Sequence, residues 1–169
     1  AVPRIRAAAD GARWLVRVQN RDGGFPTFCR GWGFLPFDRS SPDLTAHALR
    51  ALLAWAPEVP ARLGRSIRRA AGRAMAYLAR TQRADGAWEP LWFGCHRAPD
   101  RANLTYGTTR VLTALTAPET QAFSPHEATL AAGADYLIAA QGADGGWGGA
   151  PGCEPSIEET ALAVDALCL

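Results

Sequence analysis

Asp43 and His47 are the two side chains whose types and spacing best suit proton-transfer chemistry. They lie four residues apart in an alanine-rich helical pattern, and residues at this spacing share one face of a helix. A carboxylate beside an imidazole favours the imidazolium, so we expect Asp43 to raise the pKa of His47. The pair therefore indicates acid–base chemistry. The same spacing also fits a structural role, in which Asp43 caps a helix start and His47 packs in the core.

The helix that carries this pair is one part of a unit that occurs three times. Segments 19–25, 82–88 and 141–147 each begin with Gln, turn at Asp-Gly followed by Gly or Ala, and end with an aromatic residue. An aromatic–Leu pair precedes each Gln at the same distance. Similarity at a nearly fixed period means that one supersecondary unit is reused. The repeats occupy about residues 1–60, 61–120 and 121–169.

Each repeat contains two helical patterns and no sustained alternation, so we expect an all-α chain with essentially no sheet. The first helix of each pair leads into the turn and is expected at 4–19, 61–82 and 125–141. The second follows a loop and is expected at 42–55, 106–117 and 156–168. Ser41 with Pro42, and two Ser–Glu capping boxes that begin at Ser124 and Ser156, support three of the helix starts.

The composition excludes several classes of function. The length of 169 residues fits one domain, and 48% hydrophobic residues indicate a globular chain. All 18 basic residues are arginines, and 16 acidic residues nearly balance them, so we expect no nucleic-acid partner.

No apolar run is long enough to cross a membrane and no signal peptide is recognisable, which favours a cytoplasmic location. The four cysteines lack metal-site spacing, so we expect free thiols and no metal.

The repeated turn resembles the QW repeat of the triterpene cyclases, and three copies in one chain make the resemblance specific. Segment 42–47 also resembles the Asp-Val-Thr-Ala-His segment of squalene–hopene cyclases, and segment 105–108 resembles their Tyr-Gly-Thr segment. The resemblance implies an α/α toroid. Three helical hairpins would form roughly half of an α6-α6 barrel, as a partial catalytic domain over residues 1–169, with the remainder of the barrel missing from this chain.

The resemblance also implies roles for individual residues. His47, beside Asp43, would pair with the DxDD acid motif whose central Asp protonates a polyene, and Tyr106 would lie near that acid. Trp92 resembles a Trp that lines the substrate cavity; loop packing is the alternative role for it. The substrate would be a polyprenoid such as squalene, with no cofactor. Peripheral association with the cytoplasmic leaflet of a membrane would be expected of the full-length protein.

The chain departs from the family pattern because it contains no DxDD motif. The absence would be explained equally well if the motif lay upstream of this segment or if the chain were an inactive relative of the family. We therefore expect the segment alone to be inactive, and unstable or self-associating, because half a barrel exposes its inner wall. The alternative function is a non-catalytic or differently specialised toroid that binds an apolar ligand or a partner. A prenyltransferase-type zinc site is disfavoured, since Cys95 and His96 are adjacent and lack further ligands.

Overall fold

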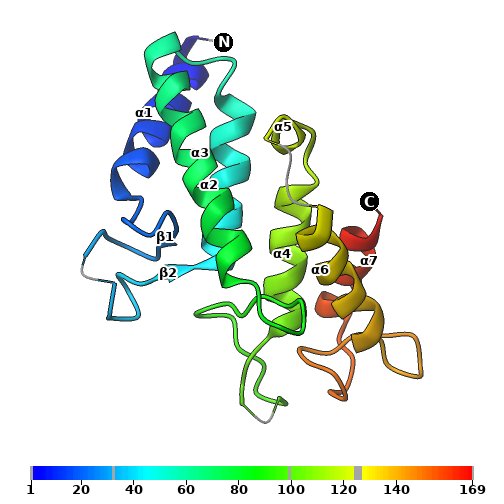
Figure 1. Ribbon diagram of the computed structural model, residues 1–169. Coiled ribbons are helices and arrows are strands. Elements are labelled where there is room, and N and C mark those ends of the chain that lie inside the picture. The colour runs from blue at the N-terminus through cyan, green and yellow to red at the C-terminus, as the bar shows by residue number, and fades with distance from the viewer. Residues whose placement is uncertain (1, 32, 99, 124–126, 169) are drawn as a thin grey trace.

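Figure 1 shows the computed structural model, which describes residues 2–31, 33–98, 100–123 and 127–168. Helices dominate these residues, which confirms the all-α prediction. The elements in chain order are α1 (Val2–Val18), β1 (Phe25–Pro26), β2 (Ser40–Ser41), α2 (Pro42–Trp55), α3 (Ala61–Thr81), α4 (Leu104–Leu115), α5 (Pro118–Gln121), α6 (Glu127–Ala140) and α7 (Ile157–Leu167). Among the described residues, no helix is both long and apolar enough to cross a membrane.

The helices form two rows (Figure 1). The inner row consists of the second helix of each repeat, and α4 packs between α2 and α7. The outer row consists of α1, α3 and α6. Two inner helices pack against the outer helix of the following repeat, α2 against α3 and α4 against α6. In Figure 1, α1 therefore lies at one end of the arrangement, and α6 with α7 lies at the other.

Most helix boundaries agree with the sequence pattern to within two residues. The range 42–55 is confirmed, and α4 begins two residues before its predicted start because Asn103 Oδ1 caps it by accepting the Tyr106 N–H at 3.0 Å. Ser156 Oγ accepts the Glu159 N–H at 3.1 Å, as the second capping box predicts. The box that begins at Ser124 lies outside the described residues.

Two features were not predicted from the sequence. The short helix α5 follows α4, and its Thr120 Oγ1 donates to the Ala114 carbonyl oxygen at 2.8 Å. A two-residue antiparallel ladder joins β1 to β2, with Phe25 opposite Ser41. This ladder is too short to show a period-two pattern, which is why sequence alternation did not detect it.

The three repeated turns at 19–25, 82–88 and 141–147, called QW turns here for their resemblance, have the same hydrogen bonds. The side-chain Nε2 of Gln19, Gln82 and Gln141 donates to the carbonyl oxygen four residues later, at 2.8–2.9 Å. The N–H of the aromatic residue that ends each turn donates to a threonine Oγ1 in the following inner helix, at 2.9–3.1 Å; the pairs are Phe25–Thr45, Trp88–Thr108 and Trp147–Thr160. Each turn therefore fixes the start of an inner helix relative to the end of an outer one.

The first two turns also hold the next repeat. Gln19 Nε2 donates to the Ala70 carbonyl oxygen, and Gln82 Nε2 to that of Thr129, both at 2.9 Å. Gly23 and Gly86 have φ near +90°, which glycine adopts without strain. A Cβ on Gly86 would lie 2.1 Å from the Ala132 carbonyl oxygen, so the turn and the next outer helix come too close for a side chain. The predicted role of these glutamines between repeats holds for Gln19 and Gln82.

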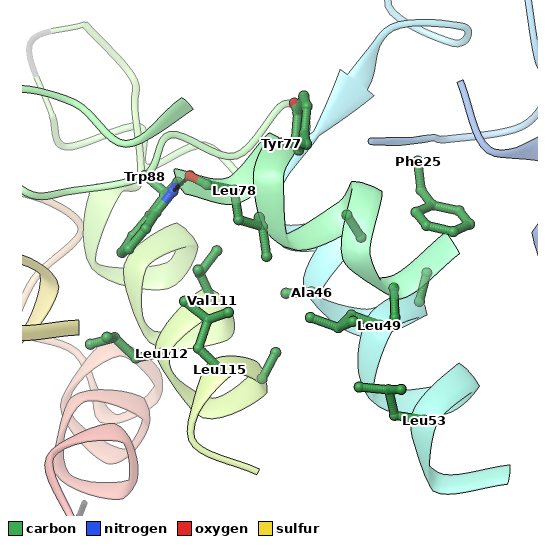
Figure 2. Close-up of a cluster of buried hydrophobic side chains, with 14 of the residues drawn as sticks. Phe25, Ala46, Leu49, Leu53, Tyr77, Leu78, Trp88, Val111, Leu112 and Leu115 are labelled. Atoms are coloured by element: carbon green, nitrogen blue, oxygen red, sulfur yellow. Dashed lines mark hydrogen bonds between the residues drawn. The ribbon is translucent and has the colours of Figure 1, made fainter. Parts of the chain in front are cut away.

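The core lies where α2, α3 and α4 meet (Figure 2). The outer helix α3 buries residues spaced three and four apart, which is the stripe expected of an amphipathic helix. Leu49 and Leu112 of the inner row are completely buried in this core. Trp88 is also fully buried, and its Nε1 donates to the Leu78 carbonyl oxygen at 2.8 Å. The core therefore joins the first two repeats.

The buried Gln19 should contribute measurably to stability. Gln19→Ala removes a donor that bridges two carbonyl oxygens and should lower the free energy of unfolding by about 1–3 kcal/mol. Gln121→Ala, on the exposed end of α5, should change it by less than about 0.5 kcal/mol. Urea titrations compare the two variants. Equal midpoints for both variants would contradict the bridging role.

Candidate functional site

The first turns of the inner helices bring the predicted site residues together. Asp43 on α2, Tyr106 on α4 and Glu158 on α7 each lie two residues before the threonine that the preceding QW turn holds. His47 and Arg110 follow one turn later on α2 and α4. Because α2 packs against α4 and α4 against α7, these positions lie at one end of the inner row. The predicted proximity of Asp43, His47 and Tyr106 follows from this register.

Asp43 is the buried acid of the site. Its residue is completely inaccessible to solvent, and Oδ1 accepts a hydrogen bond from Ser41 Oγ. Ser41 Oγ in turn accepts the Leu91 N–H at 3.0 Å, which ties the loop after the second QW turn to the start of α2. Oδ2 of Asp43 is buried without a hydrogen-bond partner among the described residues. Burying an acceptor without a partner costs free energy. We therefore expect Oδ2 either to carry a proton or to accept a hydrogen bond from an added donor.

His47 differs from its prediction. Asp43 raises the pKa of His47 as expected, but the resulting pKa lies below its ordinary value of 6.5 because other groups lower it. His47 is exposed and does not pack in the core. Partial desolvation by its neighbours still lowers the pKa most, and the Arg110 guanidinium lowers it further. Asp43 raises it, but by less than these two effects lower it. The neutral imidazole is therefore favoured near pH 7, and the expected imidazolium would require further negative charge nearby.

Tyr106 lies between aromatic and charged neighbours. Its ring is stacked on that of Phe93, with centroids 4.6 Å apart and planes inclined by 24°. The Arg110 guanidinium lies 5.5 Å from the Tyr106 ring centroid, within cation–π range. Burial raises the pKa of the Tyr106 hydroxyl, and the Asp43 carboxylate raises it further. Tyr106 is thus a neutral phenol close to the buried acid.

Trp92 lies in the loop between Trp88 and α4. About half of its side chain is exposed, and its Nε1 donates to Thr27 Oγ1 of the preceding repeat's loop. Phe93 beside it is equally exposed while it stacks on Tyr106. Trp88, in contrast, is completely buried in the core. The aromatic surface near the site therefore comes from Trp92 and Phe93, and Trp88 packs the QW turn.

Sequence reasoning overlooked Arg110 and Phe93. Arg110 lies two residues after Thr108, as His47 lies two residues after Thr45, so the internal alignment contains the signal for it. Its Nε is buried without a hydrogen-bond partner among the described residues. Phe93 directly follows Trp92, but only the loop's path shows that it reaches Tyr106. Across the described residues, no three His, Cys, Asp or Glu side chains gather closely enough to hold a metal ion.

The arrangement combines a buried carboxyl group, a neutral imidazole and aromatic rings at the end of an apolar helical row. A carboxyl group in such surroundings can take part in proton transfer. Ring faces next to it can stabilise a nearby cation by about 1–2 kcal/mol without reacting with it. The geometry therefore suits a reaction that begins with proton transfer and proceeds through cationic intermediates.

Known proteins with similar sequences are cyclases of terpenoids. The model of the squalene-hopene cyclase C-terminal domain matches residues 7–164. The chain is 34% identical to the drimenyl diphosphate synthase of Streptantibioticus cattleyicolor, over 95% of this chain and 27% of that protein. Identity to human lanosterol synthase is 30%, over 87% of this chain and 21% of that protein.

A probable squalene–hopene cyclase of Sinorhizobium fredii is 32% identical, over 84% of this chain and 21% of that protein. The chain thus spans about a fifth to a quarter of the length of these curated relatives. In each case the similarity covers 84–95% of this chain, so it does not rest on a single motif.

The opposing effects of Arg110 and Asp43 on His47 can be separated by titration. The His47 ring-proton signal should titrate with a midpoint below pH 6.5 in NMR spectra, and His47→Gln assigns it. Arg110→Met should raise this midpoint because a cation is removed, and Asp43→Asn should lower it because an anion is removed. A midpoint above 6.5, or shifts of the reverse sign, would contradict the site geometry.

Proposed function

Because this chain belongs to the squalene-hopene cyclase C-terminal domain family, we propose that it forms part of the active-site wall of a terpene cyclase. The complete protein would cyclise squalene through carbocations, after protonation of the polyene. The observation that supports this most directly is the buried Asp43, with one free carboxylate oxygen, beside His47, Tyr106 and Arg110. A structural helix cap would not require a second oxygen buried without a donor.

In this proposal Asp43 and His47 position the proton donor. The donor itself would be a DxDD motif outside these 169 residues, and its carboxylates would approach the end of the inner row where Asp43 lies. Added negative charge would raise the pKa of His47 and let the imidazolium hold one carboxylate ionised. The neighbouring carboxylic acid would then keep its proton for the substrate. The lowered pKa of His47 in this chain fits a site that gains its charge on assembly.

Aromatic side chains would guide the cation once it forms. Tyr106 and Phe93 present stacked rings beside the acid, and Trp92 extends this surface into the loop. Such faces stabilise positive charge by about 1–2 kcal/mol when water is excluded. An apolar wall also keeps water from quenching the cation. Trp92 is therefore proposed to line the substrate cavity.

A second candidate substrate class is a shorter polyprenyl diphosphate. The similarity to a drimenyl diphosphate synthase covers 95% of this chain, more than the similarity to the probable squalene–hopene cyclase covers. The proton-donating site would be the same for both substrates, because each ends in an isoprene unit with a trisubstituted double bond. Assays of the complete protein with squalene and with farnesyl diphosphate distinguish them.

Substitution of His47 tests the proposed role. In the complete protein, His47→Ala should slow substrate cyclisation by ~10²-fold or more, the size typical of assisted proton transfer. The matched control His96→Ala changes an exposed loop histidine and should leave the rate unchanged. Single-turnover formation of the cyclic product, followed by gas chromatography, measures both. A His47→Ala variant that cyclises its substrate at the parent rate would overturn the assignment.

A further inference from the structure

Arg110 lies on α4, one turn after Tyr106, and its positive charge has no anionic partner among the described residues. The ion pairs within the described part of the chain do not include Arg110. Its Nε is buried and finds no hydrogen-bond acceptor there. An unpaired donor on a charged group costs free energy where water cannot reach it. The buried Nε–H therefore calls for an acceptor.

The contact between Arg110 and Tyr106 leaves the hydrogen-bonding edge of the guanidinium available. The central carbon of the guanidinium lies over the tyrosine ring, 5.5 Å from its centroid. A contact of this kind uses the flat face of the group. The N–H groups lie in its plane and match the two oxygens of a carboxylate. Arg110 can therefore stay against Tyr106 while it binds an oxyanion.

Arg110 and His47 occupy equivalent positions on neighbouring inner helices. Each follows by two residues the threonine that a QW turn holds, Thr45 for His47 and Thr108 for Arg110. Helix α2 packs against α4, and Arg110 is near enough to lower the pKa of His47. The equivalent residue on α7 is Leu162. Once His47 is protonated, α2 and α4 would thus present two cationic donors at the same level.

The acids on these helices do not neutralise the basic pair. Asp43 raises the pKa of His47, but Arg110 opposes it with the larger effect, and the exposed Arg50 also lowers the pKa. Glu158 faces the same end from α7, where it acts on the neighbouring tyrosine. Neither acid forms an ion pair with Arg110. The site can therefore accept further negative charge.

A proton donor in the DxDD motif would need more than one cation beside it. Only one carboxyl group of the motif donates the proton, and the others would be ionised. Ionised neighbours raise the pKa of the donor and keep its proton in place. His47 can hold one ionised carboxylate. A second one needs a cation of its own, since two carboxylates close together repel each other.

We propose that Arg110 is a positioning residue that binds a second carboxylate of the DxDD motif, next to the carboxylate that His47 holds. The inference rests on the proposed function and adds a residue that the family resemblance did not indicate. The two ionised carboxylates would flank the protonated Asp and keep its proton available for the substrate. The ring of Tyr106 would hold the guanidinium in the required place.

Substitution of Arg110 in the complete protein tests the inference. Arg110→Met removes the charge at similar length and should lower kcat for cyclisation by ~10-fold or more, as expected when a hydrogen bond to a charged group is lost. Arg110→Lys keeps the charge without the planar fork and should retain part of the rate. The matched control Arg50→Met removes an exposed charge that also acts on His47, and should change kcat by less than about twofold. Circular dichroism checks folding, and Arg110→Gln replaces the Met variant if that variant does not fold.

The pH dependence of kcat separates carboxylate binding from a packing role. A cation lowers the pKa of a carboxylate beside it, so loss of Arg110 should raise that pKa. The carboxylate is then ionised only at higher pH. The acidic limb of the pH–rate profile should therefore move up by ~1 pH unit in Arg110→Met and stay near the parent position in Arg110→Lys. If both variants were slow and the acidic limb did not move, Arg110 would only pack on Tyr106 and the inference would be wrong.

Other results would overturn the inference in distinguishable ways. An Arg110→Met variant with the parent kcat and acidic limb would exclude the carboxylate contact and leave the proposed function standing. An unchanged kcat with a raised KM for farnesyl diphosphate, but not for squalene, would assign Arg110 to the diphosphate of the substrate. A parent protein that forms no cyclic product from either substrate would remove the proposed function and the inference with it.

Discussion

The fold depends on one contact, made where a glutamine at the end of an outer helix reaches the backbone of the next outer helix. Gln19 and Gln82 each use both hydrogens of one amide, one for their own turn and one for the following repeat. In the same turn, the backbone N–H of the aromatic residue donates to a threonine Oγ1 of the inner helix. A single short sequence thus sets the position of both rows, which explains why it is repeated with so little change.

The candidate site is a consequence of this register. Since each turn holds its threonine, the residues two positions earlier lie at the same height on neighbouring inner helices. Asp43 therefore lies near enough to Tyr106 to raise the pKa of its hydroxyl, although 63 residues separate them in the chain. The loop that carries Trp92 and Phe93 is fastened to the same end by the Leu91 N–H bond to Ser41 Oγ. The same repeated unit therefore supplies both the contacts that hold the repeats together and, at other positions, the residues of the candidate site.

Much of this arrangement was predictable because its causes are local. Gln, Gly and aromatic residues at fixed spacing predicted the three repeats. Pro42 predicted the start of α2, although Ser41 makes no side-chain cap bond there. Asp43, His47 and Tyr106 could be placed together because the inner helices align. The pKa of His47 could not be predicted, because it depends on burial and on Arg110 from another helix. The stacking of Phe93 on Tyr106 depends on a loop path that no periodic pattern encodes.

The central claim is that this wall belongs to a site where a proton from an acid starts cyclisation. The most direct measurement is mass spectrometry of products formed by the complete protein in D2O, with squalene and farnesyl diphosphate supplied separately. Acid initiation transfers one solvent-derived hydron to the trisubstituted double bond of the terminal isoprene unit. One deuterium is expected in every molecule of cyclic product. Cyclic product without deuterium, or no cyclic product from either substrate, would contradict it.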